Sequence, residues 1–125
     1  MTDERISDPH RSTWERYVAC WRAAEEDDKR AIMADCLDDD CVYTDPLTVA
    51  RGTDALLAYM LDFHRQIPGG HFVTTYFLAH HDRSVARWEM RAGDGSLLGD
   101  GMSYAEYRTD GRLTAMTGFF ATPGG

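Results

Sequence analysis

Apolar residues in the first half of the chain follow the spacing of α-helices. The first predicted helix has one wide apolar face, formed by Trp14, Tyr17, Val18, Cys20 and Trp21. It opens on the capping-box pattern Ser12–Glu15, in which a hydroxyl group and a carboxylate satisfy free backbone donors. A second helix is predicted from about Asp28 to Leu37. A third begins at Thr53–Asp54 and ends at Pro68–Gly70.

From His71 onward the pattern changes to the alternation of β-strands. Four strands are predicted there: His71–Ala79, Val85–Arg91, Leu97–Arg108 and Leu113–Ala121. The turns Gly93–Ser96 and Thr109–Arg112 have the composition of hairpin connections. Gly101, Ser103 and Ala105 share one strand face, which leaves room for the body of a ligand.

One earlier strand contains Val42 and Tyr43 and stops at Asp45–Pro46, since proline lacks the backbone donor of a strand. The segment Pro46–Gly52 is expected to be a loop or a short irregular extended piece. Helices on one side of an antiparallel sheet make an α+β fold. A strongly curved sheet with three helices across its concave side forms a cone with an apolar interior. We expect a flexible tail over 1–11, one domain over 12–121 and a frayed end over 122–125.

The net charge of −8 argues against binding to nucleic acid or an anionic membrane, because both require a basic surface. No apolar run approaches the ~20 residues that span a bilayer. The three cysteines are an odd number without a CxxC pair, which favours free thiols in the cytoplasm. The acidic runs and His80–Asp82 lack metal-ligand spacing, so we expect no metal.

Asp45 is the main candidate functional residue. At the end of a short strand with helices on both sides, its carboxylate is placed to point into a cavity. The alternative is that Asp45 only begins a turn and contacts water, because Asp and Pro are common turn residues. Nothing in the sequence supports a nucleophilic triad, a phosphate-binding loop or a nicotinamide site.

Four segments, in this order and spacing, resemble the nuclear transport factor 2-like superfamily, and within it the SnoaL-like and ketosteroid isomerase-like proteins. They are Arg16–Ala19, Tyr43–Pro46, Gly52–Thr53 and Asp110–Leu113. The resemblance covers about residues 12–121 and implies a cystatin-like, NTF2-like roll. That fold hosts isomerases, cyclases, dehydratases, hydrolases and binding proteins, so it does not define an activity.

The resemblance also implies roles for individual residues. Asp45 matches the general base of the isomerases, and Tyr17 matches the tyrosine that stabilises the enolate oxygen. The second donor of that family, a protonated carboxylic acid, is replaced here by Ser103. Serine donates a hydrogen bond but is a weaker acid, which puts steroid isomerisation in doubt. The tyrosines that support Tyr17 in some relatives fall at Leu37 and Met60.

His64, one turn after Met60, is a candidate proton carrier, or else a partner of carbonyls at the end of its helix. Further large residues are expected to line the pocket: Trp14, Trp21, Tyr43, Met60, Phe63, Tyr76, Trp88, Met90 and Phe119. The leading interpretation is a cofactor-free isomerase, cyclase or dehydratase acting on a small apolar carbonyl compound. The alternative is a non-catalytic module that binds an apolar ligand or dimerises. In both interpretations we expect a homodimer.

Overall fold

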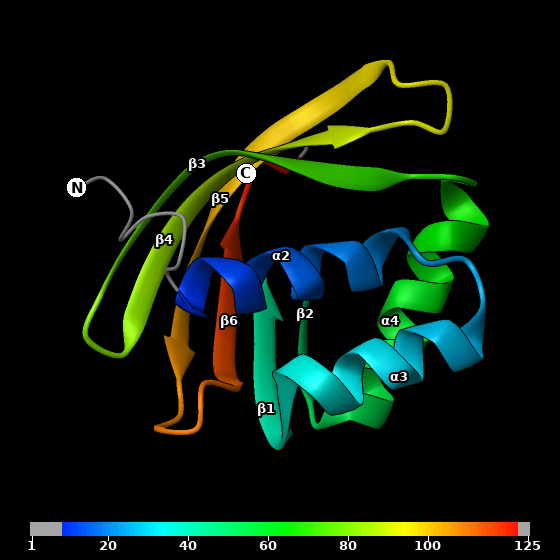
Figure 1. Ribbon diagram of the computed structural model, residues 1–125. Coiled ribbons are helices and arrows are strands. Elements are labelled where there is room, and N and C mark those ends of the chain that lie inside the picture. The colour runs from blue at the N-terminus through cyan, green and yellow to red at the C-terminus, as the bar shows by residue number, and fades with distance from the viewer. Residues whose placement is uncertain (1–8, 123–125) are drawn as a thin grey trace.

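The computed structural model describes residues 9–122, which form three helices and one mixed sheet (Figure 1). The helices are α2 (Pro9–Arg22), α3 (Glu26–Cys36) and α4 (Thr53–Gln66). The strands are β1 (Leu37–Asp45), β2 (Thr48–Arg51), β3 (His71–His80), β4 (Arg83–Arg91), β5 (Leu97–Tyr107) and β6 (Leu113–Phe119). The expected α+β fold, with three helices on a strongly curved sheet, is confirmed.

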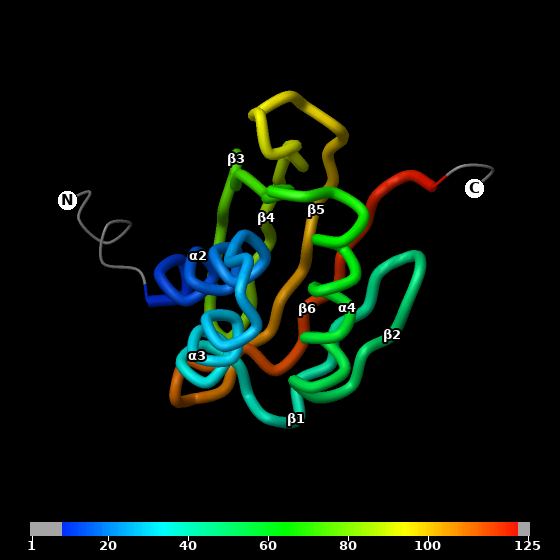
Figure 2. Tube along the Cα trace, turned by 90° about the vertical axis from the view of Figure 1, so that its right-hand side faces the viewer, coloured from blue at the N-terminus to red at the C-terminus, as the bar shows by residue number. Residues whose placement is uncertain are grey.

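The strands lie in the order β2-β1-β6-β5-β4-β3. β1 and β6 pair in parallel, and all the other neighbours are antiparallel, so the sheet is mixed rather than purely antiparallel. The segment expected to be a loop or a short extended piece contains β2, which pairs with β1. In Figure 1, β3, β4 and β5 bend around α2. In Figure 2, α4 stands beside the β2–β1 end of the sheet.

The first helix begins at Pro9, three residues before the capping-box pattern at Ser12. Proline suits this position because the first turn of a helix needs no backbone donor. The Ser12 hydroxyl instead accepts a long hydrogen bond of 3.5 Å from the Arg16 guanidinium. Residues 9–11 of the expected tail are therefore helical, whereas residues 1–8 lie outside the described part of the chain.

Lys29 joins α3 to the end of α2. Its side chain is fully buried, and its Nζ donates to the carbonyl oxygens of Cys20 at 2.8 Å and Trp21 at 3.4 Å. These carbonyls belong to the last turn of α2, where the helix itself supplies no donors. The ammonium group therefore acts as a cap delivered from the next helix. Burial lowers the pKa of Lys29.

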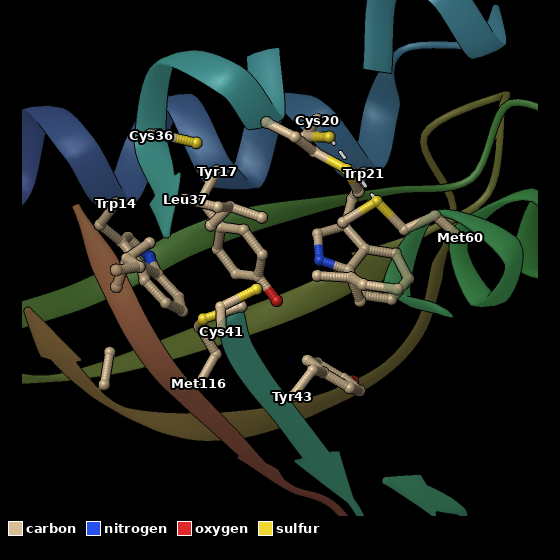
Figure 3. Packing of buried hydrophobic residues seen from close by; sticks show 14 of the residues in the cluster. Trp14, Tyr17, Cys20, Trp21, Cys36, Leu37, Cys41, Tyr43, Met60 and Met116 are labelled. Atoms are coloured by element: carbon tan, nitrogen blue, oxygen red, sulfur yellow. Dashed lines mark hydrogen bonds between the residues drawn. The ribbon is translucent and has the colours of Figure 1, made fainter. Parts of the chain in front are cut away.

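The core lies between the helices and the concave face of the sheet (Figure 3). Its buried apolar residues come from every helix and from five of the strands, and they include Trp14, Tyr17, Trp21, Leu37, Leu56, Met60, Ala105, Leu113 and Met116. The three cysteines are free and buried. In Figure 3 the Cys20 thiol contacts the Met60 sulfur, at 3.6 Å, where α2 meets α4.

Candidate functional site

A cavity of about 480 Å³ lies between α2, α4 and the concave face of the sheet. Nine of the residues that line it in the described part of the chain are aromatic. The aromatic lining residues are Trp14, Tyr17, Trp21, Tyr43, Tyr59, Phe63, Phe72, Trp88 and Phe120. A cavity of this size, with an apolar wall and a few polar groups, has the character of a small-molecule site.

Asp45 forms the polar end of this cavity and is 8% exposed. Its Oδ2 accepts hydrogen bonds from the hydroxyl groups of Tyr43 at 2.6 Å and Tyr59 at 2.8 Å. Its Oδ1 accepts the backbone N–H groups of Leu47 at 2.8 Å and Thr48 at 3.1 Å. Asp45 is thus both the turn residue and the cavity residue that the sequence offered as alternatives.

The two tyrosines are donors held in place by this carboxylate. Burial raises the pKa of the Tyr43 hydroxyl and of the Tyr59 hydroxyl well above the usual range. The hydrogen bonds to Asp45 raise both pKa values further, since they stabilise the protonated phenol. Both hydroxyl groups therefore keep their protons at neutral pH. We call Asp45, Tyr43 and Tyr59 the Asp45 cluster.

Ser103 lies beside the Asp45 cluster on β5. Its Oγ accepts a hydrogen bond of 3.0 Å from Nε1 of Trp88. Between Ser103 and the cluster lies Gly118 on β6, which pairs directly with Ser103. A Cβ on Gly118 would lie 3.6 Å from Cβ of Asp45, 3.8 Å from Oγ of Ser103 and 3.9 Å from the hydroxyl oxygen of Tyr43. The absent side chain thus leaves a small gap among three polar residues.

Tyr17 reaches the cavity wall from α2. In Figure 3 its hydroxyl group points away from α2 toward the sheet, beside the Trp21 indole. Burial raises the pKa of the Tyr17 hydroxyl well above its usual range, an effect that the hydrogen bond with the Trp21 side chain partly opposes. Tyr17 is therefore a neutral phenol at a dry part of the wall, where hydrogen bonds are strong.

The charges on the cavity wall are all negative. Besides Asp45, the lining contains the carboxylates of Asp62 and Asp100, and among the described residues no lysine, arginine or histidine lines it. Asp62 is half exposed and receives hydrogen bonds from Arg65 at 3.3 Å and Gln66 at 2.7 Å. The cavity therefore offers an incoming anion no countercharge on its wall.

Most residues expected at the site do line the cavity. They are Asp45, Tyr17 and Ser103 among the polar candidates, and Trp14, Trp21, Tyr43, Phe63, Trp88 and Met90 among the pocket residues. The space expected above Gly101 is absent, because the Trp88 indole fills it. A Cβ on Gly101 would lie 2.6 Å from two ring atoms of Trp88.

Four expected site residues lie elsewhere. Met60 is completely buried in the core between helices. Tyr76 is 51% exposed, because the register of β3 shifts between Thr74 and Tyr76 and turns Tyr76 to the outer face of the sheet. Phe119 is 55% exposed. It follows inward-facing Gly118, and successive strand residues face opposite ways, so Phe120 lines the cavity instead.

His64 is the fourth of these residues. Its Nε2 contacts the carbonyl oxygen of Gly70 at 3.1 Å, and the side chain is absent from the cavity lining. Burial, and then the charge of Lys29, lower the pKa of His64. This position fits the alternative interpretation of His64 as a partner of a carbonyl near its helix end.

Tyr59 was not predicted to be a site residue. It lies one residue before Met60, and one residue on a helix is a rotation of about 100°, which directs Tyr59 toward β1 instead of the helical core. A signal was present, because Tyr59 has helical spacing to both Leu56 and Phe63 on the apolar side of α4. The hydroxyl partner of Asp45 could have been sought on that face.

Comparison with known proteins places the chain in a family. The model of the SnoaL-like domain matches residues 14–116, and the chain therefore belongs to the SnoaL-like family. The NTF2-like superfamily assignment made from the sequence is confirmed. No protein of curated function matches the sequence. None of the helices in residues 9–122 is long and apolar enough to cross a membrane.

Solved structures share the fold at low sequence identity. A proposed isomerase of the SnoaL-like family from Agrobacterium tumefaciens is 22% identical, with a TM-score of 0.84 over 92% of this chain and 99% of that one. A proposed SnoaL-like polyketide cyclase from Jannaschia sp. CCS1 is 14% identical, with a TM-score of 0.74 over 90% and 85%. TerC, co-crystallised with polyporic acid, is 17% identical, with a TM-score of 0.74 over 92% and 93%.

Proposed function

We propose that this SnoaL-like protein is a cofactor-free enzyme that transfers a proton on a small apolar carbonyl compound held in the cavity. The observation that carries the proposal is the carboxylate of Asp45, 8% exposed, at the polar end of an aromatic cavity of about 480 Å³. A carboxylate largely shielded from bulk water and next to a bound substrate is a suitable general base. Isomerases, cyclases and dehydratases of this fold family fall within the proposal.

In the proposed reaction Asp45 removes a proton from the carbon next to the carbonyl group. The electron pair of that C–H bond moves to the carbonyl oxygen, which becomes an enolate, and the proton resides on Oδ2 of Asp45. To accept it, Oδ2 gives up its hydrogen bond from Tyr59, the less buried of its two tyrosine partners. Return of the proton from Asp45 to another carbon completes an isomerisation.

Two further side chains have roles in this proposal. Tyr17 donates a hydrogen bond from its hydroxyl group to the carbonyl oxygen and keeps its proton, and its neutral phenol in a dry wall suits the stabilisation of developing charge. Ser103 is a second polar contact of the substrate. His64 has no role, since it lies away from the cavity lining. The names of the similar structures, a proposed isomerase and a proposed polyketide cyclase, support the same class of reaction.

The test is deuterium exchange at the carbon atoms next to the carbonyl group of 2-tetralone, a bicyclic apolar ketone, followed by NMR in D₂O. The wild-type protein should accelerate exchange over buffer, and Asp45→Asn should remove the acceleration. Asp62→Asn is the matched control, because Asp62 is also a carboxylate of the cavity wall but is half exposed. Equal exchange with wild type and Asp45→Asn would contradict the role of Asp45.

We also propose that two copies pair through the outer face of the sheet. Apolar residues gather there on adjacent strands and are exposed in the monomer: Tyr76, Leu78, Val85, Met102 and Phe119. An exposed apolar surface of this kind is typical of an interface. Sedimentation equilibrium should give the mass of a dimer, and Met102→Lys should give a monomer. The three free thiols support a cytoplasmic location for this dimer.

A further inference from the structure

Asp45 has no acceptor site left for a ligand. A carboxylate offers about four lone-pair directions, two on each oxygen. Two backbone N–H groups occupy Oδ1, and the phenols of Tyr43 and Tyr59 occupy Oδ2. A polar group of a ligand in the resting cavity therefore finds no free lone pair on Asp45 and hydrogen-bonds to the oxygens of the tyrosines rather than to the carboxylate.

The tyrosine oxygens are acceptors in this arrangement. Each phenol has a single hydroxyl proton, and both protons are engaged in hydrogen bonds to Asp45. Only the lone pairs of the two phenol oxygens remain to face a ligand. Ser103 has the opposite character. Its Oγ already accepts the indole N–H of Trp88, and its own hydroxyl proton remains to be donated. The polar end of the cavity thus presents an acceptor, the Tyr43 oxygen, and a donor, the Ser103 hydroxyl.

Gly118 separates this acceptor from this donor. The position that a Cβ on Gly118 would take lies 3.9 Å from the Tyr43 oxygen and 3.8 Å from the Ser103 oxygen. An oxygen atom bound above Gly118 would have to lie closer to both than this Cβ position, within about 3.2 Å of each. A hydroxyl oxygen suits this place, because one hydroxyl group donates one hydrogen bond and accepts another. An ether or an unprotonated carbonyl group would leave the Tyr43 oxygen without a donor.

The charge of the wall restricts the ligand further. All three charged lining residues in the described part of the chain are aspartates. Burying an anion there costs its hydration, and no cation on the wall offsets that cost. A neutral ligand avoids this cost.

We propose that the cavity selects a neutral hydroxylated ligand whose O–H group lies over Gly118, donating to the Tyr43 oxygen and accepting from the Ser103 hydroxyl. The substrate is then an alcohol, phenol or enol that also carries the carbonyl group required by the proposed function. The inference rests on the proposed function only in placing the substrate in this cavity. Binding of the hydroxyl group is measurable without any turnover.

Three naphthalene derivatives of one shape test the proposal by isothermal titration calorimetry at pH 7. 2-Naphthol has the hydroxyl group, 2-methoxynaphthalene lacks its proton, and 2-naphthoate is an anion. 2-Naphthol should bind about tenfold more tightly than the ether, the effect of one well-formed hydrogen bond. 2-Naphthoate should bind at least about 100-fold more weakly than 2-naphthol, because its charge is buried without a partner.

Gly118→Ala tests whether the preference for the hydroxyl group arises at the space above Gly118. The added methyl group meets its neighbours at ordinary contact distances of 3.6 to 3.9 Å, so the fold accommodates it, while the place for the hydroxyl group is filled. The variant should keep its melting temperature and bind 2-naphthol no more tightly than the ether. Gly99→Ala is the matched control. It adds a methyl group to the cavity wall with nothing within 4 Å, and it should keep the preference.

The outcomes separate this inference from the proposed function. Equal affinities of 2-naphthol and 2-methoxynaphthalene, affinity of 2-naphthoate equal to that of 2-naphthol, or no binding of 2-naphthol at 1 mM would each overturn the inference. So would a preference unchanged in Gly118→Ala. None of these results bears on the 2-tetralone exchange assay. Conversely, a preference for 2-naphthol that Gly118→Ala removes would support the inference even if Asp45→Asn retained exchange.

Discussion

Lys29 and Asp45 are both charged groups shielded from water, and both have their polar atoms satisfied by neighbouring groups. Lys29 is completely buried and donates to two carbonyl oxygens at the end of α2. Asp45 is 8% exposed and accepts four hydrogen bonds, two of them from a turn and two from tyrosines. The difference lies in what borders each group. Packed protein surrounds Lys29, whereas Asp45 faces a cavity.

This difference separates a structural charge from a candidate functional one. Burial is common to structural ion sites and active sites, so it does not identify function alone. Lys29 spans two helices and contacts only protein. The polar atoms of Asp45 are also hydrogen-bonded, but Asp45 borders a space large enough for a ligand. The neighbouring space, and not the buried charge, is therefore the informative feature of the Asp45 cluster.

The largest expected effect on stability is that of a substitution at Lys29. Lys29→Met keeps the length of the side chain but leaves the carbonyl oxygens of Cys20 and Trp21 without their donor. We expect the free energy of unfolding to fall by about 2–3 kcal/mol in urea denaturation, the range for hydrogen bonds to a charged group. Arg30→Met, at the next and half-exposed position, should change it by less than about 1 kcal/mol. If Lys29→Met were as stable as the wild type, the Lys29 cap would not contribute to stability.

A pH effect on the same site comes next. Burial raises the pKa of the Cys20 thiol from 9.0 to about 11, and the charge of Lys29 opposes this shift. Between these pH values the unfolded thiol has lost its proton while the folded one keeps it, so stability falls as pH rises. The stability of the wild type relative to Cys20→Ala should decrease by up to about 1.4 kcal/mol per pH unit above pH 9. Urea denaturation of both proteins at pH 8, 9 and 10 measures this difference, and parallel curves would contradict it.

The smallest effect is expected at the cavity. Tyr59→Phe removes one of the four hydrogen bonds to Asp45, and the freed Oδ2 faces the cavity, where water has access. We expect a loss of about 0.5–1 kcal/mol in the free energy of unfolding. Tyr104→Phe removes a comparable hydrogen bond to Glu106 on the outer face and serves as the control, with less than about 0.5 kcal/mol. A loss as large as that in Lys29→Met would show that the Asp45 cluster is also a structural site.

The sequence was sufficient to predict the family, the three helices and the curved sheet, because these depend on local periodicity and on short motifs. It also placed Asp45 at the end of a strand beside a cavity. It was not sufficient for the parallel pairing of β1 with β6, since these strands are far apart in the chain and no turn sets their register. The hydrogen-bond partners of Asp45 were not predicted, because Tyr43 was expected only as a pocket residue and Tyr59 was overlooked.

Single-residue offsets account for most of the remaining differences. Tyr59 was overlooked in favour of Met60, and Phe119 was expected where Phe120 lies. On a helix one residue changes the direction of a side chain by about 100°, and on a strand it reverses that direction. Tyr76 differs through the register shift in β3, which alternation alone does not reveal. A pocket residue can therefore be assigned from sequence only where the register of its helix or strand is known.

The Trp88 side chain restricts the size of this cavity. Its indole occupies the volume that Gly101 leaves open, and Ser103 anchors its N–H group. A smaller residue at position 88 would join that volume to the existing space, while the backbone around Gly101 stayed in place. The same scaffold would then admit bulkier molecules without alteration of the Asp45 cluster. This side chain thus restricts ligand size, and it is the first position to vary when the protein is redesigned as a host for larger compounds.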